Sequence, residues 1–325
     1  MLDTARQDTF KLRKGLDLPI TGEPDQSIIE NKPVTRVAVT APEFIGLRPA
    51  MRVAEGQTVR RGDVLFEDKK NPGIRFTSPA AGTVQAIHRG DRRALLSVVI
   101  SLNERERTGQ IIPDDQVAFS AFTGRPINEL SRDEVRALLL ESGMWTAFRT
   151  RPFSKIPPCD AVPHSIFVTA MDTNPLAADA NVVLEGKSPR FETGLLALTK
   201  LTDGKVYVCT GPRSSNVTVP THPQIRRVVF EGPHPSGTPG VHIHFLDPVH
   251  RGKTVWHIPY QEIVAIGELM QSGSLVVERI IALAGPSVQR PRLLRTRLGA
   301  ATDELTAGEL SPGEHRVISG SVVSG

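Results

Sequence analysis

The pattern of apolar and polar positions divides the chain into a strand-rich first third and a longer part in which helices and strands alternate. In the first hundred residues, short runs rich in β-branched residues are separated by glycine turns such as Glu55-Gly56 and Ala81-Gly82. Such runs predict short strands, here at Thr35–Thr40, Thr58–Val59, Val64–Phe66, Ile74–Thr77, Thr83–Ile87 and Leu95–Ile100. Closely spaced short strands with glycine turns indicate a small barrel or sandwich.

From about residue 105 the pattern becomes that of an α/β protein. Ser131 and Glu134 form a capping box ahead of the apolar stretch Val135–Leu140, which predicts a helix over Arg132–Ser142. Further strands are expected at Ser165–Ala170, Val206–Thr210, Arg226–Glu231 and His242–Leu246, and helices at Leu176–Leu184 and Arg190–Leu201. The order strand, helix, strand is typical of a parallel sheet with helical crossovers.

The last part of the chain, from about Thr254, has the pattern of a small mixed domain. It predicts a helix at Gln261–Met270 and strands at Leu275–Ala282, Leu293–Leu298 and His315–Val323. A chain of 325 residues is too long for one ordinary core. We therefore expect an α/β multidomain protein with domains at residues 1–104, 105–253 and 254–325.

Composition narrows the classes of function. The net charge of +4 comes from 39 cations and 35 anions, and with two Trp and two Tyr it does not indicate nucleic-acid binding. Two cysteines, Cys159 and Cys209, are too few for a four-thiolate iron–sulfur or zinc site. No apolar run approaches the roughly 18 residues of a membrane span, and the start is too polar for a signal peptide. We expect a cytoplasmic protein that only other subunits hold at a membrane.

One candidate for chemistry lies in the strand-rich part. Val53–Leu65 and Thr77–Val84 resemble a biotinyl/lipoyl carrier domain, in which a lysine at the tip of a hairpin carries the prosthetic group. Lys69 and Lys70 stand where that lysine would be, but the flanking residues depart from the family's pattern. The resemblance implies a β barrel-sandwich fold, and we expect a structural barrel, with carrier function as an alternative.

A second candidate is the glycine-rich segment His234–His244. If it enters a strand, the alternate residues His242 and His244 point to one face, and His234 can return toward them. Three imidazoles could bind zinc, but no acidic or cysteine partner stands at a ligand-like spacing. We therefore predict a shaped interface or ligand-contact loop and no metal site.

The loop after the first buried strand argues against a dinucleotide site. Asp172-Thr173-Asn174-Pro175-Leu176 lacks the Gly-x-Gly-x-x-Gly pattern that lets the backbone approach a pyrophosphate. Its Thr173 or Asn174 could cap the following helix. Serine-hydrolase, paired-carboxylate and Walker patterns are absent from the sequence as well. We predict no catalytic residue and no independent binding of NADH or flavin.

Four arginines stand within eight residues, at Arg290, Arg292, Arg295 and Arg297. The simplest interpretation is a solvated strand face. The alternative is a surface that meets lipid headgroups or an acidic partner.

Several specific segments resemble the A subunit of the sodium-translocating NADH:quinone reductase. They are Lys14–Ile20, Glu141–Ser154, Ala170–Ala177 and His234–Leu246, and they are spread over most of the chain. The resemblance implies a biotinyl/lipoyl-like barrel, a Rossmann-like domain related to the flavin subunit of respiratory complex I, and a β-grasp (SLBB-like) domain. Family members continue for roughly another hundred residues, a length that adds one more unit, so the resemblance also implies a missing C-terminal region.

The resemblance implies a role as well. It is that of a peripheral subunit without a cofactor on the cytoplasmic face of the bacterial inner membrane, soluble and inactive when isolated, beside a flavin-bearing membrane subunit. The complex uses NADH, flavins, iron–sulfur and ubiquinone, and it exports Na⁺. The candidate residues for contact with quinone or a partner subunit are Asn174, His234, Gly237, Gly240, His242 and His244.

Two other functions stay open at this point. The C subunit of the Rnf electron-transfer complex shares the architecture but carries ferredoxin-like cysteine clusters, against which Cys159 and Cys209 argue. A biotinyl-type carrier or assembly module has no respiratory role, and a prosthetic group on Lys69 or Lys70 would reveal it.

Overall fold

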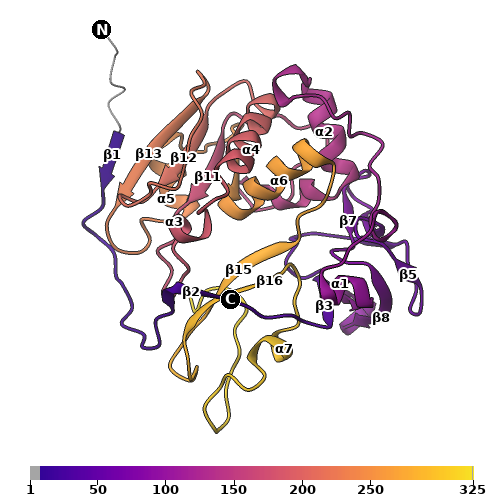
Figure 1. Ribbon diagram of the computed structural model, residues 1–325. Coiled ribbons are helices and arrows are strands. Elements are labelled where there is room, and N and C mark those ends of the chain that lie inside the picture. Colours follow the sequence, from indigo (N-terminus) through magenta and orange to yellow (C-terminus); the bar gives the residue numbers. More distant parts are fainter. Residues whose placement is uncertain (1–7, 324) are drawn as a thin grey trace.

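The computed structural model describes residues 8–323 and Gly325. Figure 1 shows a β-rich unit, a central α/β unit and a small sheet built largely from the C-terminal part of the chain. The central unit is organised around a six-stranded sheet of order β1-β13-β12-β11-β14-β10. Its strands are β1 (Asp8–Lys11), β10 (Arg149–Arg151), β11 (Ile166–Ala170), β12 (Val206–Thr210), β13 (Ile225–Glu231) and β14 (Val255–Pro259).

The β-rich unit contains the short strands that the sequence predicts, and also β4, which it does not predict. They are β3 (Arg36–Thr40), β4 (Pro49–Met51), β5 (Thr58–Val59), β6 (Val64–Asp68), β7 (Arg75–Thr77), β8 (Gly82–Arg89) and β9 (Leu95–Leu102). They form two sheets, β3-β9-β8-β5 and β4-β6-β7, and Leu65, Phe66 and Phe76 are buried in an apolar cluster to which both sheets contribute. This is the predicted barrel-sandwich, and the short helix α1 (Glu104–Thr108) follows it.

The central sheet is parallel except at one edge, where β10 runs antiparallel to β14. Side chains along each strand alternate between its two faces, so Ile166 and Val168 belong to one apolar cluster and Phe167 to another. The covering helices are α2 (Arg132–Glu141), α3 (Ala180–Val183), α4 (Ser188–Leu201), α5 (Pro239–Leu246) and α6 (Tyr260–Ser272). α4 and α6 lie over one face, and α5 contributes Ile243 to the cluster on the other (Figure 1).

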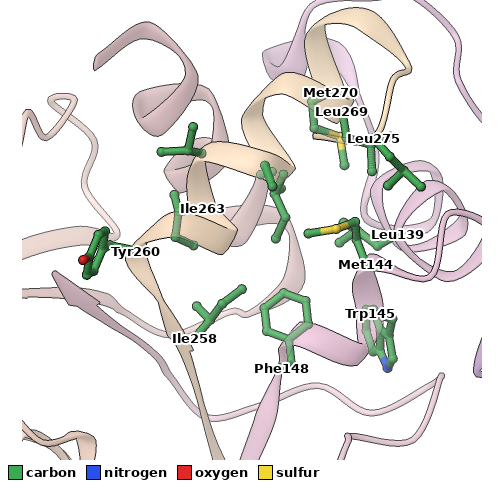
Figure 2. Close-up of a cluster of buried hydrophobic side chains, with 14 of the residues drawn as sticks. Leu139, Met144, Trp145, Phe148, Ile258, Tyr260, Ile263, Leu269, Met270 and Leu275 are labelled. Atoms are coloured by element: carbon green, nitrogen blue, oxygen red, sulfur yellow. The ribbon is translucent and has the colours of Figure 1, made fainter. Parts of the chain in front are cut away.

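Part of the Glu141–Ser154 segment is buried in this core. Figure 2 shows Met144, Trp145 and Phe148 directed toward side chains of β14 and α6. Trp145 packs edge-on against Phe148, with ring centroids 5.5 Å apart, and against Trp256, with ring centroids 5.3 Å apart. These residues of the segment therefore join the connection after α2 to the central sheet.

A fourth sheet pairs a strand from the N-terminal part of the chain with two strands from the C-terminal part. It has the order β15-β16-β2, from β15 (Glu278–Leu283), β16 (Arg292–Arg297) and β2 (Asp25–Asn31), and the helix α7 (Thr302–Thr306) follows. β1 thus lies in the central sheet and β2 in the C-terminal sheet, while β14 and α6 belong to the central unit. Strand pairing crosses the predicted domain limits at residues 104 and 253, and the limits themselves stay predictions.

Most of the predicted elements are confirmed to within a few residues, but three are wrong. His242–Leu246 is the end of helix α5, because Pro239 at its first turn favours helix initiation and a short apolar run fits either structure. Leu176–Leu184 is helical only from Ala180, which Asp179 precedes as a cap. His315–Val323 forms no strand.

The arginine group at 290–297 is a solvated strand face only in part, since Arg290 and Arg295 are exposed and Arg292 and Arg297 are not. The Arg292 side chain is 6% exposed and pairs with Glu30 and Glu309, at 2.6 and 2.9 Å. Arg297 pairs with buried Glu106 at 2.6 Å. Arg290 also pairs with Glu30, and Arg295 with Glu278. The interpretation as a solvated strand face was wrong for Arg292 and Arg297, because Glu30 of β2 and Glu106 of α1 are brought alongside from distant segments. The alternative of a surface for lipid or a partner stays a prediction.

Candidate functional site

Three of the specific sequence segments meet at one edge of the central sheet. β1, β11 and β13 run parallel, so the segments that follow them, residues 12–20, 171–179 and 232–238, leave from the same edge. Ligands of open α/β sheets bind at this edge, outside the carboxyl ends of the strands. We call the three segments together the strand-end site.

Thr173 holds two of the segments together. Its Oγ1 accepts a hydrogen bond from the Gly237 backbone N–H at 2.9 Å and lies 3.2 Å from Nδ1 of His234. The approach at Gly237 is so close that a Cβ there would lie 2.7 Å from the Thr173 nitrogen. A hydroxyl that bonds to both loop residues fixes the relative position of the loops.

The Lys14–Ile20 segment closes over the same loop. Asp17 accepts a hydrogen bond from the His234 N–H at 2.8 Å, and the Leu16 N–H donates to the His234 carbonyl at 2.9 Å. A Cβ on Gly15 would lie 2.2 Å from that carbonyl oxygen, so this crossing requires glycine. Leu16 is left 64% exposed. The segment thus presents an apolar side chain from a fixed backbone.

Asn174 is half-buried at the same edge. Its amide nitrogen donates to Asp172 at 2.7 Å, and its side-chain oxygen accepts from Ser321 at 3.0 Å. Asp172 also accepts from the backbone N–H of Asn174 at 2.8 Å. Thr173 and Asn174 do not cap α3; Asp179 does, through the Asn181 N–H.

The three histidines of the His234–His244 segment do not converge. His242 is fully buried on α5, with its Nε2 2.9 Å from the Ser236 carbonyl and its ring centroid 4.4 Å from that of Phe230. His244, two residues further along the helix, is exposed. The predicted common face was wrong, because residues two apart share a face of a strand but not of a helix.

Burial decides the charge of His242. Removal from water lowers its pKa to about 4, and the hydrogen bond to Ser236 opposes that shift only in part. The ring is therefore neutral near pH 7 and packs on Phe230 as a largely apolar group. Gly240, at the start of α5, is exposed, and a side chain there would meet open space.

No metal ligand set is evident in the part of the chain that the structure describes. Within residues 8–323 and 325, no group of three or more His, Cys, Asp or Glu side chains is placed to hold a metal ion. The predicted lack of a metal stays a prediction, which elemental analysis can test.

The hairpin with Lys69 and Lys70 is held against the central unit. Asp68, 6% exposed, accepts hydrogen bonds from the backbone N–H groups of Arg48 and Lys70 at 3.1 and 3.0 Å. The Pro72 carbonyl lies 3.4 Å from the Sγ of Cys159 in the central unit. The side chains of Lys69 and Lys70 are themselves exposed, so the structural interpretation stays a prediction that mass spectrometry of the two lysines can test.

The sequence missed two residues of the strand-end site. Thr173 and Asp17 bond to the His234 loop, yet neither was among the candidate contact residues. Both lie in segments that carry the family resemblance, so the resemblance could have identified them as candidate residues. What the sequence lacked was the pairing of β1 with β13, which places residue 17 beside residue 234.

Comparison with protein families gives matches along most of the chain. Residues 10–103 match the NqrA N-terminal barrel-sandwich hybrid domain, residues 130–275 the NqrA second alpha/beta domain, and residues 280–325 the NQRA C-terminal domain. The A subunit of the Na(+)-translocating NADH-quinone reductase of Pasteurella multocida is 50% identical over 317 residues, 97% of this chain and 68% of that protein. The Yersinia pestis bv. Antiqua (strain Angola) protein of the same name is 51% identical over 316 residues, with the same coverage.

The chain belongs to the NqrA family, the A subunits of the Na⁺-translocating NADH-quinone reductase. The family models also confirm the three-part fold class, with a barrel-sandwich, an α/β domain and a C-terminal SLBB domain.

Similarity to solved structures is weaker. The NAD⁺-reducing [NiFe]-hydrogenase in the air-oxidized state aligns with a TM-score of 0.40 and 14% identity, over 62% of this chain and 42% of that one. Similarity this weak establishes neither fold nor function. Within the described residues, no helix has the length and apolar character needed to cross a membrane.

Proposed function

We propose that this chain is a peripheral subunit of a Na⁺-translocating NADH:ubiquinone reductase on the cytoplasmic face of the bacterial inner membrane. It docks on the flavin-bearing membrane subunit and contributes to ubiquinone interaction and assembly, while other subunits carry the flavins and iron–sulfur. Electrons pass from NADH to ubiquinone, and Na⁺ is exported. The names of relatives at 50% and 51% identity support this role.

The observation that carries the proposal is the meeting of three separate family segments at the strand-end site. Thr173, His234 and Asp17 lock these segments into one surface, and that surface presents Leu16, 64% exposed. Phe245 of α5 is 47% exposed near β1, where its ring centroid lies 5.5 Å from that of Phe10. A rigid loop surface with apolar side chains suits contact with quinone or another subunit.

The charges at this site support a subunit without a nucleotide cofactor. In a dinucleotide fold the pyrophosphate sits where the first strand leads into its helix. Here exposed Asp172 lies in the loop after β11 and accepts a hydrogen bond from the Asn174 N–H. Asp179 caps the helix α3 that follows. Two carboxylates at that position repel phosphate, since like charges in close range are unfavourable.

Two measurements test the proposal. First, the purified full-length protein is expected to show no flavin or iron–sulfur absorbance and no NADH oxidation. A stoichiometric bound flavin would overturn the cofactor-free role.

Second, membranes containing the full-length protein with or without the other subunits are washed at rising ionic strength. We expect salt-resistant retention only in the presence of those subunits, because a sizeable protein interface survives moderate salt. Equal retention in their absence would contradict docking.

A further inference from the structure

An open cavity of about 300 Å³ lies between the β-rich unit and the central unit. Its wall combines apolar residues of the β3–β4 connection with Lys70 from the β6–β7 hairpin and with residues of the segment after β10, among them Lys155 and Ile156. We call it the Lys70–Lys155 cavity. It is separate from the strand-end site, and no residue of that site lines it.

The cavity is unusual in its charge. Among the described residues, no carboxylate forms an ion pair with Lys70 or Lys155 of the wall, with the neighbouring Lys69 or with Arg149, although the charge of Glu43 acts on Arg149. Arg149 instead stands over the ring of Phe44, another wall residue, at 5.0 Å. The one acidic wall residue, Asp68, is occupied by backbone N–H groups and by Asn71.

The arginine group at 290–297 differs from this cavity, because its charges are neutralised internally. All four arginines between 290 and 297 pair with glutamates. Cations without a carboxylate partner, grouped around a concave surface, leave a positive potential that favours an anionic partner.

Exposed apolar side chains stand beside these cations. Ile45 is 55% exposed in the cavity wall, and Phe153 is 75% exposed on the turn between Thr150 and Lys155. That turn is fixed by hydrogen bonds from the N–H groups of Ser154 and Lys155 to Thr150, at 2.9 and 3.2 Å. Phe153 has a φ of 79°, a conformation costly for a non-glycine residue that the surrounding contacts must hold in place.

We propose that the Lys70–Lys155 cavity binds an acidic segment of another polypeptide. The segment places a bulky apolar side chain between Ile45 and Ile156 and carboxylates beside the two lysines. A small anion would use the lysines but not the exposed Phe153 and Ile45, whereas a rigid aromatic beside a pocket is typical of a protein interface. The inference rests on the proposed function in one respect, that the partner is another subunit of the same complex.

The first test is photocrosslinking in the assembled complex. Benzoylphenylalanine replaces Phe153 in the full-length protein, which is expressed with the other subunits, illuminated and analysed by mass spectrometry. We expect a crosslink to an Asp- or Glu-rich peptide of another subunit. Leu96, 42% exposed on β9, is the control position and is expected to give none. Crosslinks from position 153 to lipid alone, or to no partner, would overturn the inference.

The second test reverses charge. Lys70→Glu with Lys155→Glu is compared with Arg92→Glu and Arg93→Glu, two exposed cations outside the cavity. The first pair is expected to lower co-purification of the other subunits by roughly tenfold or more at moderate salt, with an unchanged Tm, and the control pair by little. Equal co-purification by both pairs would refute the docking surface and leave the proposed function standing. If the unaltered protein fails to co-purify at all, the proposed function falls, and this inference with it.

Discussion

At the scale of single residues, buried histidines make the fold sensitive to acid. Burial lowers the pKa of His242 to about 4 and that of His257 to about 3. Among the described residues, Nδ1 of His242 and Nε2 of His257 have no hydrogen-bond partner. An added proton would therefore create a buried charge without compensation.

The His242→Gln variant tests this effect. An unfolded histidine titrates near its ordinary pKa of 6.5, and the folded one near 4, so the unfolded state binds more protons between these values. The contribution of His242 to the free energy of unfolding should fall by about 3 kcal/mol as pH drops from 6.5 and should level off below 4, while His257 continues to lower the wild-type stability toward pH 3. Denaturation across this range should show a smaller loss for His242→Gln. Identical pH profiles would contradict the assignment.

Thr173 provides a second test at this scale. Thr173→Val keeps the shape but removes the oxygen that accepts from the Gly237 N–H and contacts His234. Loss of a hydrogen bond of about 1–2 kcal/mol should speed hydrogen exchange in residues 234–238 by roughly tenfold. Thr173→Ser, which keeps the hydroxyl, should exchange like the wild type. If the valine variant does so too, the hydroxyl does not fix the loops.

The candidate residues were only partly predictable. The sequence marked three segments that the structure brings together at one edge of the sheet, and their role in contact stays a prediction. It misjudged which side chains face outward, since His242 and His244 were placed on a strand and lie on a helix. The orientation depends on the backbone period, which a short apolar run does not determine.

At the scale of elements, long periodic helices and β-branched strands were predictable, and short helices were not. The capping box at Ser131 and Glu134 is present as expected, with α2 at Arg132–Glu141. β11 and β12 appear where continuous apolar runs predicted buried strands. The errors at α3 and α5 involve helices of four and eight residues, in which caps and tertiary contacts outweigh periodicity.

The contact between α4 and α6 depends on glycines. A Cβ at Gly267 would lie 1.7 Å from the Arg190 carbonyl oxygen, so Gly267→Ala must push the helices apart. We expect it to lower the free energy of unfolding by roughly 1–3 kcal/mol or more. Gly240→Ala, where a Cβ meets no atom within 4 Å, is the control and should change stability by less than about 0.5 kcal/mol. Equal stability of the two variants in urea denaturation would refute the close approach.

At the scale of the whole molecule, a buried ion cluster joins the β-rich unit to the C-terminal sheet. The Glu106 side chain is fully buried and accepts from Arg61 of the first unit at 2.8 Å and from Arg297 of β16 at 2.6 Å. Burial alone would raise the Glu106 pKa, but the two guanidinium groups reverse the effect and lower it. The sequence could not predict this cluster, because its members are up to 236 residues apart (297 − 61).

Glu106→Gln removes the charge and leaves two largely buried arginines without their counter-ion. We expect a loss of about 3–5 kcal/mol in the free energy of unfolding, because breaking a buried pair leaves an uncompensated charge in the interior. Glu104→Gln, at an exposed pair with Arg107, should cost less than about 1 kcal/mol. Calorimetry of the two variants measures the difference in Tm. Similar Tm values would show that the cluster does not join the units.

The proposed role in the complex is tested most directly by electron transfer. The reductase is prepared with and without the full-length form of this subunit, and NADH oxidation is followed with ubiquinone and, separately, with a soluble artificial acceptor. If the subunit carries no redox centre but docks and helps to hold quinone, its omission should strongly reduce ubiquinone reduction and leave the artificial reaction largely intact. Restoring the protein should restore quinone reduction. Unchanged ubiquinone reduction without the subunit, or NADH oxidation by the isolated protein, would contradict the account.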